Sequence, residues 1–298
     1  MNRPEESKEV PEHFHSEVTN TWMSSKFDLG AASHQGHVRE NNEDRYLAVR
    51  FGRSLESVST NIDQHLLEKS YIFTGYGMLV ADGIGGLDLG EVASSTALIK
   101  LVELILDTPD WTLALKRERD VRTVLQRMTQ RFLQIDETLR EEAKNHPALN
   151  RMATTLTVAG ILGTDLVIGH VGDSRAYLLR GTELKQLTTD HTLAQALIDA
   201  GVANRDDPAT RSMRHVLTAA IGSMGELIDP QVERYQLKSE DRILLCTDGL
   251  TEMVDDKTIA EVLREATSSQ SACNTLVDLA LGAGGVDNIT VVVARCGG

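Results

Sequence analysis

Acidic residues that follow or precede apolar runs are the part of this sequence that could do chemistry. Five aspartates stand at such boundaries: Asp44, Asp82, Asp173, Asp248 and Asp287. Each alone suits a turn or a helix cap, since Asp-Gly, Asp-Ser and Asp-Asn are good turn pairs. If the five side chains meet, however, they repel one another unless cations neutralise them. Oxygen ligands without matching histidine or cysteine favour Mg²⁺ or Mn²⁺ over zinc.

The stretch Leu79–Gly86 indicates how one of these carboxylates is held. An apolar run stops at Asp82, three glycines follow within four residues, and a helical pattern begins near Leu89. A strand end, a tight turn and a helix place one carboxylate at a rigid edge with little backbone in its way. A nucleotide-binding glycine loop is disfavoured, because no Gly-Lys-Ser/Thr follows these glycines.

The elements that must position these residues can be predicted from hydrophobic periodicity. Helices are expected at Leu89–Leu106, Asp120–Lys144, Thr192–Ala200, Lys257–Ala266 and Cys273–Leu281. Strands are expected at Phe27–His34, Tyr46–Val49, 71–81, Thr154–Leu162, Leu166–Val171, Ala176–Leu179, Val232–Leu237, Arg242–Cys246 and Ile289–Ala294. Strands cluster and helix pairs cluster, without strict alternation. That order predicts an α+β layered domain with mainly antiparallel sheets.

The domain organisation follows from local composition. Residues 1–25 are polar and acidic, with prolines, and are expected to be a disordered tail. Residues 26–298 are expected to form one domain. Within it, the irregular polar stretch at about 51–70 is interpreted as a surface insertion. The polar segment at about 201–215, with weak periodicity, is interpreted as a mobile flap.

Charge and cysteine content exclude several classes of function. The 298 residues carry a net charge of −14, with a pI of about 5.1. Such a field repels nucleic acid and anionic membrane surfaces. The chain has no apolar run long enough to insert in a bilayer and no signal-peptide core. Its three cysteines form no CxxC pair, which favours a reduced cytoplasm.

Eight short motifs of polar and glycine residues follow one another along the chain. They are Arg39-x-x-Asn42-Glu43-Asp44, Val80-Ala81-Asp82-Gly83-x-Gly85-Gly86, Gly90-Glu91, Thr154-Thr155-Leu156, Gly172-Asp173-Ser174-Arg175, Thr189-Asp190-His191, Thr247-Asp248-Gly249-Leu250 and Asp287-Asn288-Ile289-Thr290. In this order they resemble the motifs of the metal-dependent protein phosphatases (PPM, type 2C) in their bacterial form. The resemblance covers about residue 27 to the end. It implies a four-layer α-β-β-α sandwich of two mainly antiparallel sheets, with a two-metal site at one edge.

The resemblance implies a role for each acidic residue. Asp82 bridges both metal ions, Mn²⁺ or Mg²⁺, and the Gly83 carbonyl binds one of them. Asp248 and Asp287 bind the second ion. Asp173 joins Asp248 in a possible third metal site.

Three further residues act through water or on the substrate in this reading. Glu43 and Asp44 reach metal-bound waters. Arg39 holds the substrate phosphate as a bidentate cation. The alternative for Arg39 is a surface salt bridge with Glu43 or Asp44.

The implied activity is hydrolysis of phosphoserine and phosphothreonine in proteins by a metal-bridging hydroxide. The partners are phosphorylated proteins, including a cognate Ser/Thr kinase. No Cys-x5-Arg loop surrounds any cysteine, and Cys246 is expected to be a buried small side chain. The alternatives are a catalytically inactive binding module, which would need a lost ligand, and a two-metal nuclease, which the acidic charge disfavours.

Two positions depart from the family pattern. Histidine occurs in many relatives where this chain has Ile84 or Leu87, so protonation of the leaving group needs another source. His37 is a candidate, although a surface position is the simpler interpretation. His170 and His191 are expected to be structural.

Overall fold

The computed structural model describes residues 27–56, 70–85, 89–108, 118–204, 207–225 and 227–297. The expected tail at residues 1–25 lies outside these ranges, as does Leu87. Within the described residues, every strand pairing is antiparallel. The predicted α+β class with mainly antiparallel sheets is therefore confirmed.

Two five-stranded sheets form the centre of the described structure. The first has the order β1-β12-β11-β8-β9, so the first and last described strands pair. Its strands are β1 (Phe27–His34), β12 (Ile289–Cys296), β11 (Arg242–Cys246), β8 (Arg175–Arg180) and β9 (Glu183–Gln186). The second has the order β10-β7-β6-β3-β2, comprising β10 (Gln231–Gln236), β7 (Asp165–Val171), β6 (Leu156–Leu162), β3 (Ser70–Ala81) and β2 (Arg45–Glu56). A short ribbon pairs β4 (Gly83–Ile84) with β5 (Ala153–Thr154).

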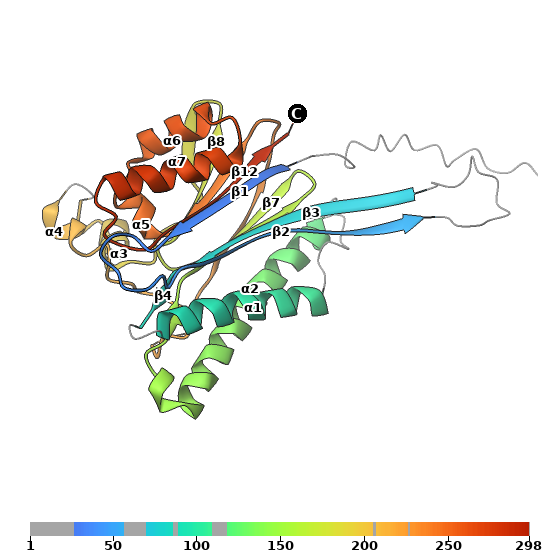
Figure 1. The fold of residues 1–298 in the computed structure, drawn as a ribbon. Coiled ribbons are helices and arrows are strands. Elements are labelled where there is room, and N and C mark those ends of the chain that lie inside the picture. The colour runs from blue at the N-terminus through green and yellow to red at the C-terminus, as the bar shows by residue number, and fades with distance from the viewer. Residues whose placement is uncertain are drawn as a thin grey trace, which may run out of the picture.

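Helices cover the outer face of each sheet (Figure 1). α1 (Leu89–Asp107) and α2 (Glu118–Asn145) pack on the second sheet, and α6 (Asp256–Glu265) and α7 (Ser269–Gly282) on the first. The result is the expected four-layer sandwich. The shorter helices are α3 (Leu193–Asp199), α4 (Pro208–Arg211), α5 (Asp248–Thr251) and the 3₁₀ turn Pro147–Leu149.

Alternation along the strands explains the layers. On β3, Met78 and Val80 point between the sheets, while Leu79 and Ala81 point toward α1 and α2. Successive side chains on a strand face opposite sides, and here both sides are covered. Apolar residues therefore run continuously instead of alternating with polar ones, which is why these strands were visible as uninterrupted runs in the sequence.

The structure corrects several element boundaries. Residues 51–56 are not irregular but extend β2 in a long ribbon with β3, and the rest of the expected insertion, 57–69, lies outside the described residues. The flap segment contains α4, which Asp207 caps through the Ala209 backbone N–H. β9 and α5 were missed because both are only four residues long. α7 begins at Ser269, where Ser268 and Ser271 form a capping box that the apolar pattern did not reveal.

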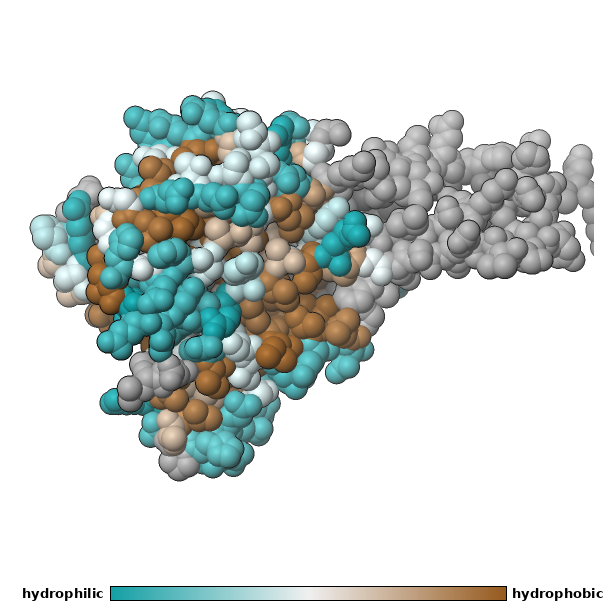
Figure 2. Space-filling view, viewed as in Figure 1, coloured by the Kyte–Doolittle hydropathy of each residue, from teal (hydrophilic) through white to brown (hydrophobic). Residues whose placement is uncertain are grey.

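An apolar groove of about 400 Å³ lies between the second sheet and the α1–α2 pair. Leu47 and Phe51 line it from β2, and Ile105 and Leu106 from the last turn of α1. Figure 2 shows a hydrophobic area on this face of the molecule. None of the helices in the described ranges is both long and apolar enough to cross a membrane.

Candidate active site

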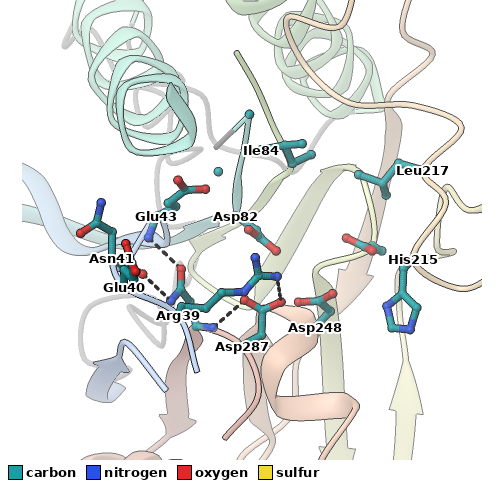
Figure 3. A pocket seen from close by; sticks show the side chains of 14 residues that line it. Arg39, Glu40, Asn41, Glu43, Asp82, Ile84, His215, Leu217, Asp248 and Asp287 are labelled. Atoms are coloured by element: carbon teal, nitrogen blue, oxygen red, sulfur yellow. Dashed lines mark hydrogen bonds and ion pairs between the residues drawn. The ribbon is translucent and has the colours of Figure 1, made fainter. Parts of the chain in front are cut away.

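A cavity of about 680 Å³ lies at one edge of the two sheets, where the acidic strand ends meet (Figure 3). Carboxylate oxygens of Asp82, Asp173 and Asp248 all lie within 4.8 Å of one another. They come from the end of β3, the β7–β8 turn and the start of α5. The sequence-predicted residues that line the cavity are Arg39, Glu43, Asp82, Gly83, Asp173, Asp248 and Asp287, with Ile84 beside them.

Two threonines hold the backbone of Asp82. Thr155 Oγ1 accepts from the Asp82 N–H at 2.9 Å, and the Thr155 N–H and Thr154 Oγ1 donate to the Asp82 carbonyl at 2.9 and 2.8 Å. Thr155 Oγ1 also lies 2.8 Å from the hydroxyl of Ser174, next to Asp173. The Thr154-Thr155 motif thus fixes the end of β3 against the β7–β8 turn, which sets the spacing of two carboxylates.

Asp44 lies beneath the cavity, not in its lining. Its side chain is buried, and Thr247 Oγ1 donates to Asp44 Oδ2 at 2.8 Å. The Thr290 N–H in turn donates to Thr247 Oγ1 at 3.0 Å. Asp44 is therefore held against the residue that precedes Asp248.

Asn288 connects the loop before β2 to the loop before β12. Its side-chain oxygen accepts from the Glu43 N–H at 2.8 Å, and its amide nitrogen donates to the carbonyls of Gln35 and Asn41, each at 2.8 Å. The backbone N–H of Asn288 donates to Asp287 Oδ1 at 2.8 Å. Asn288 therefore positions Glu43 through its side chain and Asp287 through its backbone N–H, a role that the sequence did not indicate.

Burial and mutual repulsion raise the pKa of the clustered acids. Burial is the largest cause for Asp82, Asp173 and Asp248, followed by the charges of neighbouring aspartates. For Asp44, burial raises the pKa to about 7, while hydrogen bonds from Thr290 and Thr247 oppose the shift. Burial and the neighbouring charges therefore disfavour the ionised form of all four groups, and nearby positive charge would favour it.

The residues present fit divalent cations. Asp44 Oδ1 and Asp248 Oδ1 are buried and have no hydrogen-bond partner within the described part of the chain. Buried carboxylate oxygens without partners are costly, and a metal ion would satisfy them. The Asp82, Asp173 and Asp248 oxygens together form an all-oxygen donor set, which suits a hard ion such as Mg²⁺ or Mn²⁺.

Arg39 pairs with Asp287, not with Glu43 or Asp44 as the alternative interpretation had it. Its Nη2 lies 2.6 Å from Asp287 Oδ2, and the arginine side chain stays 57% exposed. The two residues are 248 positions apart, so nothing local in the sequence indicated this pair. Figure 3 shows the guanidinium reaching over the aspartates toward the cavity.

Among the described residues, the histidine that lines the cavity is His215 and not His37. The His37 backbone N–H donates to the Gly285 carbonyl at 2.7 Å. His215 was included in the flap but was not singled out, because its partner Glu252 is distant in sequence. Its Nδ1 lies 2.6 Å from Glu252 Oε1. Burial and the nearby charge of Asp248 raise the pKa of Glu252 to about 7.

His170, His191 and Cys246 make contacts within the fold, in keeping with the structural roles expected for them. His170 Nδ1 lies 2.9 Å from Thr157 Oγ1, and burial lowers the pKa of His170 to about 3. His191 Nδ1 accepts from the Gly172 N–H at 3.1 Å. Cys246 is fully buried in β11, and burial raises the pKa of its thiol to about 12.

Comparison with known proteins shows which family the chain belongs to. A model described as protein phosphatase 2C matches residues 63–280. The chain belongs to the protein phosphatase 2C family. It is 34% identical over 265 residues to the Ser/Thr protein phosphatase PstP of Mycobacterium tuberculosis (strain H37Rv), covering 89% of this chain and 44% of that sequence. This chain therefore spans less than half the length of the PstP sequence.

One further relative, and the solved catalytic domain of PstP, match over most of their length. The Ser/Thr phosphatase Stp of Listeria innocua is 35% identical over 219 residues, covering 73% of this chain and 83% of that one. The catalytic domain of PstP, solved in complex with two manganese ions, superposes with a TM-score of 0.70 at 31% identity, covering 91% of this chain and 99% of that one. The expected family and sandwich fold are thus confirmed.

Proposed function

We propose that this chain is a metal-dependent phosphatase of phosphoserine and phosphothreonine in proteins. The observation that carries the proposal is the convergence of Asp82, Asp173 and Asp248 in one cavity beside an arginine. The relatives named as Ser/Thr phosphatases and the manganese-bound PstP domain support the reaction class. The proposed cofactors are two core ions, Mn²⁺ or Mg²⁺, with a third site beside them.

The acidic residues divide into three groups in this proposal. Asp82, the Gly83 carbonyl, Asp248 and Asp287 would hold the two core ions. Asp173 and Asp248 would hold a third. When bound, the ions activate water for attack on phosphorus and neutralise the phosphate charge.

Glu43 and Asp44 orient water at the edge of the cluster. The Glu43 carboxylate lies against Gly90 at the start of α1, and the backbone of Glu43 is fixed by Asn288. Asp44 is fixed by Thr247. Rigid support of this kind keeps a polar group in one orientation, which is what positioning of a nucleophilic water requires.

Arg39 is the proposed phosphate ligand. Its guanidinium is bound to Asp287 on one side and more than half exposed on the other. Divalent cations on Asp287 would weaken that ion pair by competing for its oxygens. Arg39 would then be free to donate two parallel hydrogen bonds to a phosphate group, a geometry that guanidinium matches.

The substrates are phosphorylated proteins, with a cognate Ser/Thr kinase among them, and the proposed location is the cytoplasm. The flap, which contributes His215 to the cavity lining, is the proposed source of selectivity. Loops at the rim of a rigid site commonly carry specificity.

Hydrolysis of p-nitrophenyl phosphate and of a phosphothreonine peptide tests the activity directly. We expect turnover of both with Mn²⁺ and loss of turnover with EDTA, restored by excess Mn²⁺. Release of inorganic phosphate is the measurement. Absence of turnover on both substrates under saturating Mn²⁺ would instead favour an inactive binding module. Cleavage of nucleic acid without phosphopeptide hydrolysis would favour a nuclease.

A further inference from the structure

Asp136, on α2, is a buried carboxylate that the proposed function does not use. It is 1% exposed, and its Oδ2 accepts from Arg140 Nε at 2.7 Å. Its Oδ1 accepts from the Gly222 N–H, also at 2.7 Å, across 86 positions of the chain. Burying a charge costs free energy even when the charge is paired. Asp136 therefore ties α2 to the segment that follows the flap, and it does so with a group that packing alone does not require.

The segment 220–225, which follows the flap, lies against α2. Arg140 Nη1 donates to the Gly225 carbonyl at 3.1 Å, so α2 holds the segment at a second point. Gly222 has a φ of +84°, and a Cβ on it would lie 2.9 Å from Leu139 Cβ. Both the left-handed backbone and the close approach require glycine. The backbone of this segment is therefore fitted to one face of α2.

The same segment forms a reciprocal backbone bridge with Thr154. The Ile221 N–H donates to the Thr154 carbonyl at 2.9 Å, and the Thr154 N–H donates to the Ile221 carbonyl at 3.0 Å. Thr154 Oγ1 and the Thr155 N–H in turn donate to the Asp82 carbonyl. Thr154 also pairs with Gly83 in the β4–β5 ribbon. Hydrogen bonds thus connect α2 to the backbone of two proposed metal ligands.

Burial makes these contacts hard to replace. Ile221, Thr154 and Thr155 are each 0% exposed, and Gly222 is buried. A buried N–H that loses its acceptor must find another or remain unsatisfied, which is costly. Without the Asp136 carboxylate, the Gly222 N–H would be in that position. A shift of the segment to relieve it would move Ile221 and, through Thr154, the end of β3.

We propose that Asp136 is a positioning residue for the proposed metal ligand Asp82. It acts through the backbone of residues 221–222 and through Thr154, and it does not itself line the cavity. The inference rests on the proposed function and adds to it a residue of α2. Groups that orient metal ligands commonly change metal affinity about tenfold to a hundredfold when they are removed.

Two variants of Asp136 test the link. Asp136→Ala removes the acceptor of the Gly222 N–H, whereas Asp136→Asn keeps a side-chain oxygen for it. Calorimetric titration with Mn²⁺ should show about tenfold weaker binding in Asp136→Ala. In EDTA, hydrogen exchange of the Thr155 N–H should be faster than in wild type by about tenfold, measured relative to the amides of α7. Asp136→Asn should restore most of both properties.

Asp241→Ala is the matched control, because Asp241 makes the same kinds of contact. It is also 1% exposed, and it accepts from Arg180 Nη2 at 2.6 Å and from the Lys238 N–H at 2.8 Å. It directly precedes β11, at the end of that strand away from the cavity. Asp241→Ala should lower Tm as Asp136→Ala does, but leave Mn²⁺ affinity and the relative exchange of Thr155 unchanged. All measurements are made well below the Tm of each variant.

A lower Tm in Asp136→Ala without a change in Mn²⁺ affinity or in Thr155 exchange would show that the residue is structural only, and would overturn the inference. Equal effects in Asp241→Ala would overturn it too, since they would follow from lost stability alone. The exchange measurement needs neither metal nor substrate. If the wild-type protein hydrolyses no phosphate ester, the proposed function fails, and Thr155 exchange still decides whether Asp136 positions Asp82.

Discussion

Asp248 links a helix start to the carboxylate cluster. It begins α5, its carboxylate lies near those of Asp82 and Asp173, and its buried Oδ1 has no hydrogen-bond partner among the described residues. Gly249 follows it, and a Cβ there would approach the Asn288 carbonyl to 2.0 Å. The close approach of these two loops explains why glycine follows the aspartate, beyond its value as a turn residue.

Asp248→Asn should lower phosphatase activity by about two orders of magnitude or more, because an amide is a weaker ligand than a carboxylate. The fold should remain intact. In EDTA the variant should melt at the same or a higher temperature, since one of several repelling charges is gone. The increase in Tm on adding Mn²⁺ should be smaller than for the wild type. Phosphate release and thermal melting measure these effects.

Asp278→Asn is the matched control, because Asp278 is an exposed acid on α7, far from the cavity lining. It should leave both activity and the Mn²⁺-dependent Tm unchanged. Full activity in Asp248→Asn would contradict the assignment of the metal ligands.

At the scale of elements, the approach of α1 to the ends of β3 and β4 brings the acidic residues together. Gly90, in the first turn of α1, lies where a Cβ would be 2.4 Å from Glu43 Oε2 and 2.6 Å from the Gly83 carbonyl carbon. The same holds for Gly83, because a Cβ added there would lie 2.2 Å from the Gly90 carbonyl oxygen. Two glycines facing each other thus let the helix reach the site.

Gly90→Ala should therefore destabilise the fold by about 1–3 kcal/mol through overpacking, and should lower activity by displacing Glu43. Gly282→Ala, at the end of α7, is the control. Apart from its chain neighbours and its own helix, no atom of the described residues lies within 4 Å of a Cβ at that position. Its change should be neutral or stabilising by about 0.4–1 kcal/mol, because alanine restricts the unfolded chain. Urea unfolding of both variants measures the difference, and equal effects would refute the packing argument.

At the scale of the whole molecule, acidic residues from both sheets lie in one cluster. The stability of the fold therefore depends on pH and on metal ions. Burial raises the pKa of Asp44 from its ordinary value of 3.8 to about 7. A folded-state pKa above the unfolded value means that the fold favours the protonated form. That contribution to stability is complete below the ordinary pKa and is lost as pH rises through about 7.

In EDTA, Tm should thus fall as the pH rises from about 5 to about 8. Mn²⁺ should reduce or reverse the fall, because cations favour the ionised carboxylates. In EDTA, the Tm of Asp44→Asn should fall less steeply with pH, because asparagine keeps an acceptor for the Thr247 hydroxyl but does not titrate. Melting curves across this pH range measure the effect. An identical slope in the variant would show that other groups are responsible.

Much of this fold could be predicted from local sequence. The long strands and helices were predictable because each apolar run contains its own periodicity, and the strand ends at Asp82, Asp173 and Asp248 because turn chemistry involves only neighbouring residues. β9 and α5 could not be predicted, because elements of four residues are too short to show a hydrophobic periodicity. The extension of β2 to Glu56 could not be predicted, because it is a strand through its pairing with β3 and not through its own sequence pattern.

The sequence by itself determined the order of helices and strands along the chain and the acidic residues at the strand ends. Both follow from residues that are near one another in the chain. Only the tertiary structure decided which distant partners meet. The pairing of Arg39 with Asp287, the contact of His215 with Glu252, and the links that Asn288 makes are of this kind. They depend on two sheets packing at one angle and register, and no short stretch of sequence encodes that arrangement.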